Sequence, residues 1–201
     1  AAEMTLRPRF QFGPQCEEFN AAVLEHVLAR DDIMTVVLAF RWPDIHADLS
    51  RAHRPFSLFA DAEGRSRSLA DNEAIFARSL ERLVKRLTEA GHTVWIIGPV
   101  PLLKHDVPRA LYLRALGLFE RRIRTTRENF TALLGPALDT IAHLQAAYGV
   151  KVVWPHEAMC VEERCRVAAE DGTPLYVDDN HLSASGALWL AGEFEPIFAG
   201  P

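Results

Sequence analysis

The sequence lacks two features that would place it in a specialised class of protein. None of its apolar runs approaches the roughly 20 residues needed to cross a bilayer. Its net charge of −5 is not the basic excess of a nucleic-acid-binding protein, so no nucleic-acid partner is expected. A chain of 201 residues with 49% hydrophobic and 24% charged residues is ordinary for a folded protein. We therefore predict one domain over residues 1–201, with a substantial core.

The start of the sequence gives no information about the cellular compartment. No signal peptide is seen, and the printed sequence begins with Ala1-Ala2 rather than with methionine. We interpret this start as the boundary of a segment of a larger protein.

Cysteines are few, and their spacing leaves three interpretations open. A local disulfide between Cys160 and Cys165 would indicate an oxidising compartment, and Cys16 would then need a partner outside this segment. A zinc site would add His156 to the three cysteines, although the spacing fits no common zinc motif. The third interpretation is three reduced thiols.

A recognisable serine nucleophile is also absent. The sequence contains no Gly-Asp-Ser block, no Gly-x-Ser-x-Gly block and no serine directly after an apolar strand. The serines between positions 50 and 68 lie in a segment that reads as a loop, and Ser79 lies in a predicted helix. None has the strand–turn–helix setting that exposes and activates a hydroxyl group.

The apolar periodicity predicts strands that alternate with helices. The predicted strands are at 33–40, 93–98 and 150–154, and the predicted helices at 16–30, 69–90, 109–148 in two pieces, and 184–197. The first strand is almost continuously apolar, which is typical of a strand buried on both faces. Residues 41–68 read as a loop, and residues 170–173 as a hairpin turn. This order predicts an α/β fold, with a parallel sheet covered by helices on both faces.

The most informative segment is Asp178-Asp179-Asn180-His181, between the last strand and the last helix. Asp178 can accept the Nδ1–H of the His181 ring, within about 2.6–3.2 Å, and leave Nε2 free to take a proton from a hydroxyl. Ser183 fits the N-cap of the following helix better than a nucleophile. The pattern is weak by itself, and the alternative is a surface turn with a solvated histidine.

A second candidate pair, Arg41-Trp42, follows the first predicted strand. In parallel sheets the functional groups gather beyond the carboxyl ends of the strands, so we expect Arg41 on the same rim as Asp178 and His181. Arg41 can stabilise a carboxylate or a developing oxyanion, and Trp42 can pack against a sugar. The alternative is an arginine in an ion pair and a tryptophan that closes the core. The basic cluster at 121–127 reads as a solvated helix face.

Five segments, in the same order, resemble the SGNH-type domain fused to the C-terminus of membrane acyltransferase-3 proteins. They are Cys16-Glu17-Glu18-Phe19-Asn20, the strand ending in Arg41-Trp42, residues 94–101 followed by Asp106-Val107-Pro108, the cysteine pair Cys160 and Cys165, and residues 174–183. The family's N-terminal Gly-Asp-Ser block, its Gly-x-Asn block and the upstream partner of Cys16 are missing from the match.

The resemblance implies a three-layer, SGNH-hydrolase-like and flavodoxin-like α/β fold that lacks its first strand and therefore has an exposed apolar edge. It implies Ser-His-Asp chemistry in which His181 is the general base and acid, Asp178 orients it, and the serine lies upstream of this segment. Arg41 and Trp42 would bind substrate or oxyanion, and Cys160 would pair with Cys165. No cofactor or metal is implied.

The reaction implied is the transfer of an O-acyl group, most simply acetyl, to hydroxyls of cell-envelope polysaccharide. The acceptor would be a cell-envelope carbohydrate, and a membrane acyltransferase domain would deliver the acyl donor. The domain would lie at the periplasmic or extracytoplasmic face of the inner membrane. Without the serine, this segment alone is expected to be inactive. The alternatives are a carbohydrate esterase of the same fold and a non-catalytic glycan-binding or structural domain.

Overall fold

The computed structural model describes residues 5–7, 13–40, 42, 58–61, 63–118, 123 and 125–199. The chain divides into two compact units. The first unit comprises Ala1–Ile97 and Pro136–Val152, and the second comprises Gly98–Gly135 and Val153–Pro201. The single domain expected over residues 1–201 stays a prediction.

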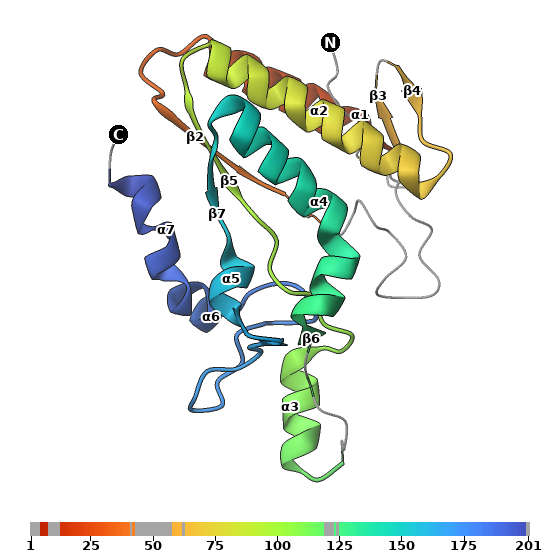
Figure 1. Ribbon diagram of the computed structural model, residues 1–201, viewed down its shortest axis with the longest axis vertical. Coiled ribbons are helices and arrows are strands. Elements are labelled where there is room, and N and C mark those ends of the chain that lie inside the picture. Colours follow the sequence, from red (N-terminus) through yellow and green to blue (C-terminus); the bar gives the residue numbers. More distant parts are fainter. Residues whose placement is uncertain are drawn as a thin grey trace. The chain divides into compact units, whose positions relative to one another are not determined.

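A three-stranded sheet organises the first unit. Its strand order is β2 (Thr35–Ala39), β5 (Thr93–Ile97) and β7 (Lys151–Val153), as Figure 1 shows. β2 and β5 are parallel, in a register that runs from Thr35 opposite Thr93 to Ala39 opposite Ile97. The α/β fold with a parallel sheet flanked by helices, predicted from the alternation of strands and helices, is confirmed.

Three long helices accompany this sheet, namely α1 (Gly13–Leu28), α2 (Leu69–Glu89) and α4 (Arg127–Tyr148). α2 begins where the Ser68 hydroxyl accepts the backbone N–H of Asp71, which is a standard N-cap. The α2 residues that share one helical face are buried, and they include Phe76, Leu80, Val84 and Leu87. An ion pair between Arg86 and Glu25, 2.8 Å long, joins α2 to α1, and the Tyr148 hydroxyl donates to Glu81 to join α4 to α2.

The edge strand β2 is more exposed than its sequence predicted. Its neighbour β5 is buried, with Val94 2% and Ile96 0% exposed, whereas Val37 of β2 is 42% exposed. The expectation that residues 33–40 are buried on both faces is therefore wrong, because exposed and half-buried residues alternate along β2 and only one of its faces is partly covered. The exposure does agree with the apolar edge that the resemblance implied. On α1, Phe19 is also exposed, by 67%.

The segment predicted as a loop at 41–68 contains two strands. β3 (Leu58–Asp61) pairs antiparallel with both β1 (Thr5–Arg7) and β4 (Gly64–Arg65). The Asp61 carboxylate accepts the backbone N–H groups of Glu63 and Gly64 and so closes the turn between β3 and β4. The prediction failed because these strands are short and depend on partners distant in sequence.

The second unit is built from short elements. Its helices are α3 (Val107–Ala115), α5 (Pro155–Met159), α6 (Ala184–Trp189) and α7 (Ala191–Phe198), and its small antiparallel sheet has the order β6 (Thr125–Thr126), β9 (Arg164–Cys165), β8 (Cys160–Val161). The helical stretch expected at 109–148 is indeed two helices, α3 and α4. The last predicted helix is broken at Leu190, which separates α6 from α7. The hairpin turn at 170–173 is confirmed by an antiparallel bridge between Ala168 and Pro174.

The core of the second unit holds the segment that leads to Asp178. Its buried members are Leu103, Val107, Ala110, Ile123, Met159, Leu175, Tyr176 and Leu190. The Tyr176 side chain is fully buried, and its hydroxyl donates to the carbonyl of Pro101 at 2.9 Å. Among the described residues, no helix combines the length and the apolar character that a membrane crossing requires.

Candidate functional site

Residues 177–181 form a tight loop closed at its base by backbone hydrogen bonds. The N–H of Val177 donates to the carbonyl of His181 at 2.9 Å, and Tyr176 bridges to Leu182 in the antiparallel sense. Just outside this bridge, the N–H of Ser183 donates to the carbonyl of Leu175. The loop therefore presents its side chains from a fixed backbone.

Within the loop, Asp178 and His181 form a hydrogen-bonded pair. The Asp178 Oδ2 atom lies 2.6 Å from Nδ1 of His181, which confirms the predicted contact. Its other oxygen, Oδ1, accepts the backbone N–H groups of Asn180 at 2.8 Å and His181 at 2.7 Å. The spacing of three residues lets one short side chain organise both the turn and the ring that follows it.

The ionised state of the Asp178 carboxylate fixes the tautomer of His181. Partial burial by itself raises the pKa of the Asp178 carboxyl, but the hydrogen bonds from the His181 ring and from two backbone N–H groups outweigh it and lower the pKa to about 2. An ionised carboxylate can only accept hydrogen bonds, so Nδ1 of His181 carries the proton. In the neutral ring, Nε2 then has a free lone pair with which to accept a proton.

The His181 side chain is open to solvent, with 62% of it exposed. No serine in the described residues donates to Nε2 of His181. Ser66 donates to the carbonyl of Ser68, Ser79 accepts from Arg82, and Ser185 lies exposed in α6. Ser50 and Ser57 lie outside the described residues. In the described part of the chain, the pair of Asp178 and His181 therefore has no serine hydroxyl bonded to Nε2.

α6 supports the loop from its C-terminal side. The Ser183 hydroxyl caps α6 by accepting the N–H of Gly186 at 2.9 Å, as the sequence predicted, and it donates to the carbonyl of Pro174 at 2.8 Å. Gly186 lies so close to Leu175 that a Cβ atom there would be 2.1 Å from the Leu175 carbonyl oxygen. Only glycine allows this approach, which holds the helix against the segment that leads to Asp178.

The segment that leads into α3, and the first residue of this helix, hold the loop by backbone hydrogen bonds. Sequence reasoning missed this role. The backbone N–H of Leu103 donates to the carbonyl of Asp179, and that of Val107 donates to the carbonyl of Asp178. Asp106 caps α3 by accepting the N–H of Arg109. The Asp106-Val107-Pro108 pattern was a signal for a helix start, but a backbone contact across more than 70 positions has no local signature.

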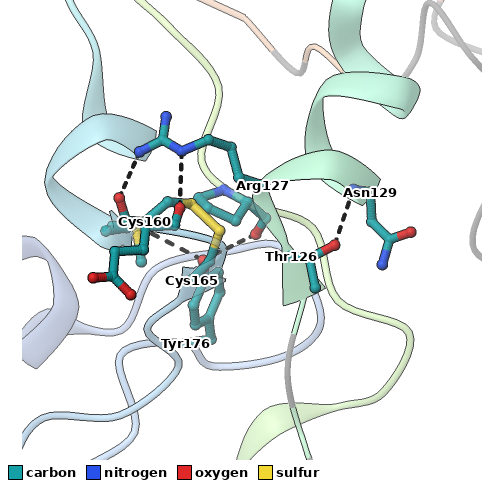
Figure 2. Close-up of a disulfide and its surroundings, with 9 residues drawn as sticks. Thr126, Arg127, Asn129, Cys160, Cys165 and Tyr176 are labelled. Carbon is teal, nitrogen blue, oxygen red and sulfur yellow. Dashed lines mark hydrogen bonds between the residues drawn. A yellow bond between two sulfur atoms is a disulfide. The ribbon is translucent and has the colours of Figure 1, made fainter.

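The predicted disulfide between Cys160 and Cys165 is present, and it closes the hairpin of β8 and β9 (Figure 2). Arg127 donates to the carbonyls of Cys160 and Glu162, which joins this hairpin to the start of α4. The bond removes the interpretation with reduced thiols at these positions, and it uses two of the sulfur atoms that a zinc site required. The buried ring of His156 instead lies 4.7 Å from that of Phe130, centre to centre.

Of the second candidate pair, Arg41-Trp42, the structure describes only Trp42. Arg41 lies outside the described residues, so its expected place beside Asp178 and His181 stays a prediction. Trp42 is only 3% exposed, and its indole N–H donates to the carbonyl of Ile97. Its ring makes edge-on contacts with Phe40 and Phe76. These contacts are those of a tryptophan that closes the core, the alternative that the sequence left open.

A comparison with known protein families assigns this chain to one of them. The family model described as "SGNH domain (fused to AT3 domains)" matches residues 3–196. The chain belongs to this family. The resemblance noted in the sequence is therefore confirmed over nearly the whole chain.

A solved structure supports the fold of this SGNH domain. The periplasmic domain of the lipopolysaccharide acetyltransferase of Salmonella ser. Paratyphi A superposes with a TM-score of 0.65 at 13% sequence identity, over 98% of this chain and 68% of that chain. At this identity the match concerns the fold. No curated protein matches the sequence.

Proposed function

We propose that this SGNH domain serves in O-acyl transfer, most simply of acetyl, to hydroxyls of a cell-envelope carbohydrate. The observation that carries the proposal is the hydrogen bond between Asp178 and Nδ1 of His181, with the ring exposed on its other side. This is the acid–base part of a Ser-His-Asp system. The serine is proposed to come from a segment of the parent protein upstream of this chain.

The proposed chemistry follows from the tautomer that Asp178 imposes. Nε2 of His181 takes the proton of the serine hydroxyl as its oxygen attacks the acyl carbonyl, and then gives that proton to the departing donor group. In the second half, Nε2 takes the proton of a sugar hydroxyl as this attacks the acyl-serine, and returns it to the serine. Asp178 stays ionised and stabilises the charged imidazolium at each step.

The proposed setting follows from the family. Domains of this family are fused to AT3 domains, which we propose as the source of the acyl donor at the membrane. The similar Salmonella domain is described as periplasmic and as part of a lipopolysaccharide acetyltransferase, which supports an extracytoplasmic place and a carbohydrate acceptor. The disulfide fits an oxidising compartment. Because the exposed His181 ring is accessible to water, it would also suit hydrolysis of the acyl group, so a carbohydrate esterase is the second candidate.

The proposal is tested with the parent protein that carries this domain. We expect release of acetate from, or acetyl transfer to, cell-envelope polysaccharide, and a loss of at least about 10³-fold in His181→Ala. The matched control is His143→Ala, because His143 is 61% exposed and lies in α4 of the same chain. Its activity should stay within about twofold.

The competing functions give different results in the same experiment. Acetate release without transfer to a sugar would identify an esterase. Polysaccharide binding without turnover, unchanged by His181→Ala, would contradict the proposal and favour a glycan-binding module. The 201-residue chain alone is expected to show no turnover, and turnover by it would show that its nucleophile lies within residues 1–201.

A further inference from the structure

The helix α3 carries apolar side chains on the face that points away from the core of its unit. Val107 and Ala110 are buried in the core of the second unit. On the opposite side of the helix, Tyr112 is 65% and Leu116 53% exposed, and Leu118, just after the helix, is 71% exposed. A helix that only covers a core has polar residues on its outer face. α3 carries apolar side chains on both faces.

The same surface is cationic in a protein that is acidic overall. Arg109 lies on the helical face of Tyr112 and Leu116, because the three are spaced three and four residues apart, and it is exposed. Lys104 and Arg114 are exposed as well. The sequence from 104 to 118 contains three Lys or Arg and one acidic residue, a net charge of +2, although the whole chain carries −5.

α3 is directly connected to the candidate site. The N–H of Val107, its first residue, donates to the carbonyl of Asp178. Within its unit, α3 extends away from α5 and α6 with its C-terminal end outermost, as the light green helix of Figure 1 shows. A surface that holds the outer end of α3 would therefore hold the loop of Asp178 and His181 about one helix length away from it.

We propose that α3 and the turn after it, residues 104–118, form a docking surface for an anionic phospholipid bilayer. Exposed Leu and Tyr next to Lys and Arg are the combination that seats a helix at the boundary between lipid headgroups and acyl chains. A polysaccharide would be bound by cations and hydrogen bonds and would not require exposed leucines. Docking would place the acid–base pair near the membrane without any spanning segment in this chain.

The experiment is co-sedimentation of the 201-residue chain with vesicles of equal parts phosphatidylglycerol and phosphatidylcholine. We expect binding that weakens with salt, about tenfold loss of affinity in the double variant Tyr112→Ser/Leu116→Ser, and about fivefold loss in each of Arg109→Gln and Arg114→Gln. The matched control is Val161→Ser/Arg164→Gln, an exposed apolar and cationic pair on β8 and β9 of the same unit. This control variant should bind the vesicles as tightly as the unsubstituted chain.

Other results would overturn the inference. Failure to bind these vesicles would contradict it, as would equal binding to vesicles of phosphatidylcholine alone. An equal loss in the control variant would show that residues 104–118 are not the docking surface. Binding to soluble anionic polysaccharide, lost in the Arg variants but not in Tyr112→Ser/Leu116→Ser, would replace the bilayer by a carbohydrate. Circular dichroism of each variant checks that it is folded. None of these measurements depends on acyl transfer, so their failure leaves the proposed function untouched.

Discussion

Asp61 in the first unit and Asp178 in the second are both aspartates with a lowered pKa, but their surroundings differ. The Asp61 side chain is fully buried, and Arg78 donates to both of its oxygens, at 2.6 and 2.9 Å. This contact is the main cause of its lowered pKa. The Asp178 side chain is 37% exposed, and its partner is a histidine.

The comparison separates a structural carboxylate from one suited to catalysis. An arginine stays protonated at any pH that a protein meets, so the pair of Asp61 and Arg78 can only hold its elements together. A histidine exchanges protons near neutral pH, and the free side of the His181 ring is open to solvent. A lowered pKa alone therefore does not distinguish the two aspartates, whereas the identity and exposure of the partner residue do.

The largest effect that tests this contrast is expected in Asp178→Asn of the parent protein. Asparagine cannot hold Nδ1 of His181 as the protonated nitrogen in the same way, so the rate of acyl transfer should fall by about 10³–10⁴-fold. The control is Asp179→Asn, which changes the neighbouring carboxylate and should stay within about twofold. A larger loss in Asp179→Asn than in Asp178→Asn would show that Asp179, and not Asp178, orients His181.

A change in stability, not in rate, is expected for Asp61→Asn. The substitution removes the buried charge and one of the two oxygens to which Arg78 and Arg82 donate, and it should lower the free energy of unfolding by about 2 kcal/mol at pH 7. Urea unfolding measures this, with Glu63→Gln as the control, because Glu63 is 64% exposed and contributes at most about 0.5 kcal/mol. A fall in the activity of the folded Asp61→Asn protein would contradict the contrast.

The pH dependence of this loss has a definite sign. The pKa of Asp61 is lower in the folded state than its unfolded value of about 3.9, so the folded state binds fewer protons. Its stabilisation is complete above the unfolded pKa and disappears as the pH falls toward the folded one. The difference in the free energy of unfolding between the unsubstituted protein and Asp61→Asn should therefore be constant from pH 7 to about pH 5 and shrink below about pH 4.

A smaller effect on stability is expected when the disulfide of the second unit is removed. The bond closes a loop between positions five apart, for which the loss of chain entropy predicts about 2 kcal/mol at most. Cys160→Ala/Cys165→Ala should also speed hydrogen exchange at residues 177–181, because Met159 and Tyr176 pack in the same core. The control Val161→Ala, at a 60% exposed position, should change neither. Unchanged exchange would show that the loop is held by α3 and α6 alone.

The smallest effect concerns a buried ionisable group, His156, whose burial outweighs the charge of Glu157, which favours its ionised form. Burial lowers the pKa of His156, and its Nδ1 has no hydrogen-bond partner in the described part of the chain. Unfolded chains take up this proton near pH 6.5, so stability should fall as the pH drops below that value. In His156→Phe the decrease in melting temperature between pH 7 and pH 5 should be shallower. An identical decrease would show that other groups cause it.

Much of the site was predictable because it is local. Asp178, His181 and Ser183 lie within six residues, and their side chains bond to each other or to backbone of the same turn. The disulfide pair is equally close in sequence. The strands β5 and β7 were predictable as well, since a short apolar run between turn residues has few other favourable conformations. The role of Asp61 was not, because Arg78 and Arg82 lie 17 and 21 positions away.

The sequence by itself determined the α/β pattern, the family and the aspartate–histidine pair, all of which rest on short-range order along the chain. The tertiary structure decided which residues are buried: Trp42 belongs to the core of its unit, and β2 is an exposed edge. It also decided that the N–H groups of Leu103 and Val107 hold the loop, and that Leu175 leaves room only for glycine at 186. Burial and long-range hydrogen bonds depend on which segments meet in space, and a one-dimensional pattern carries little of that information.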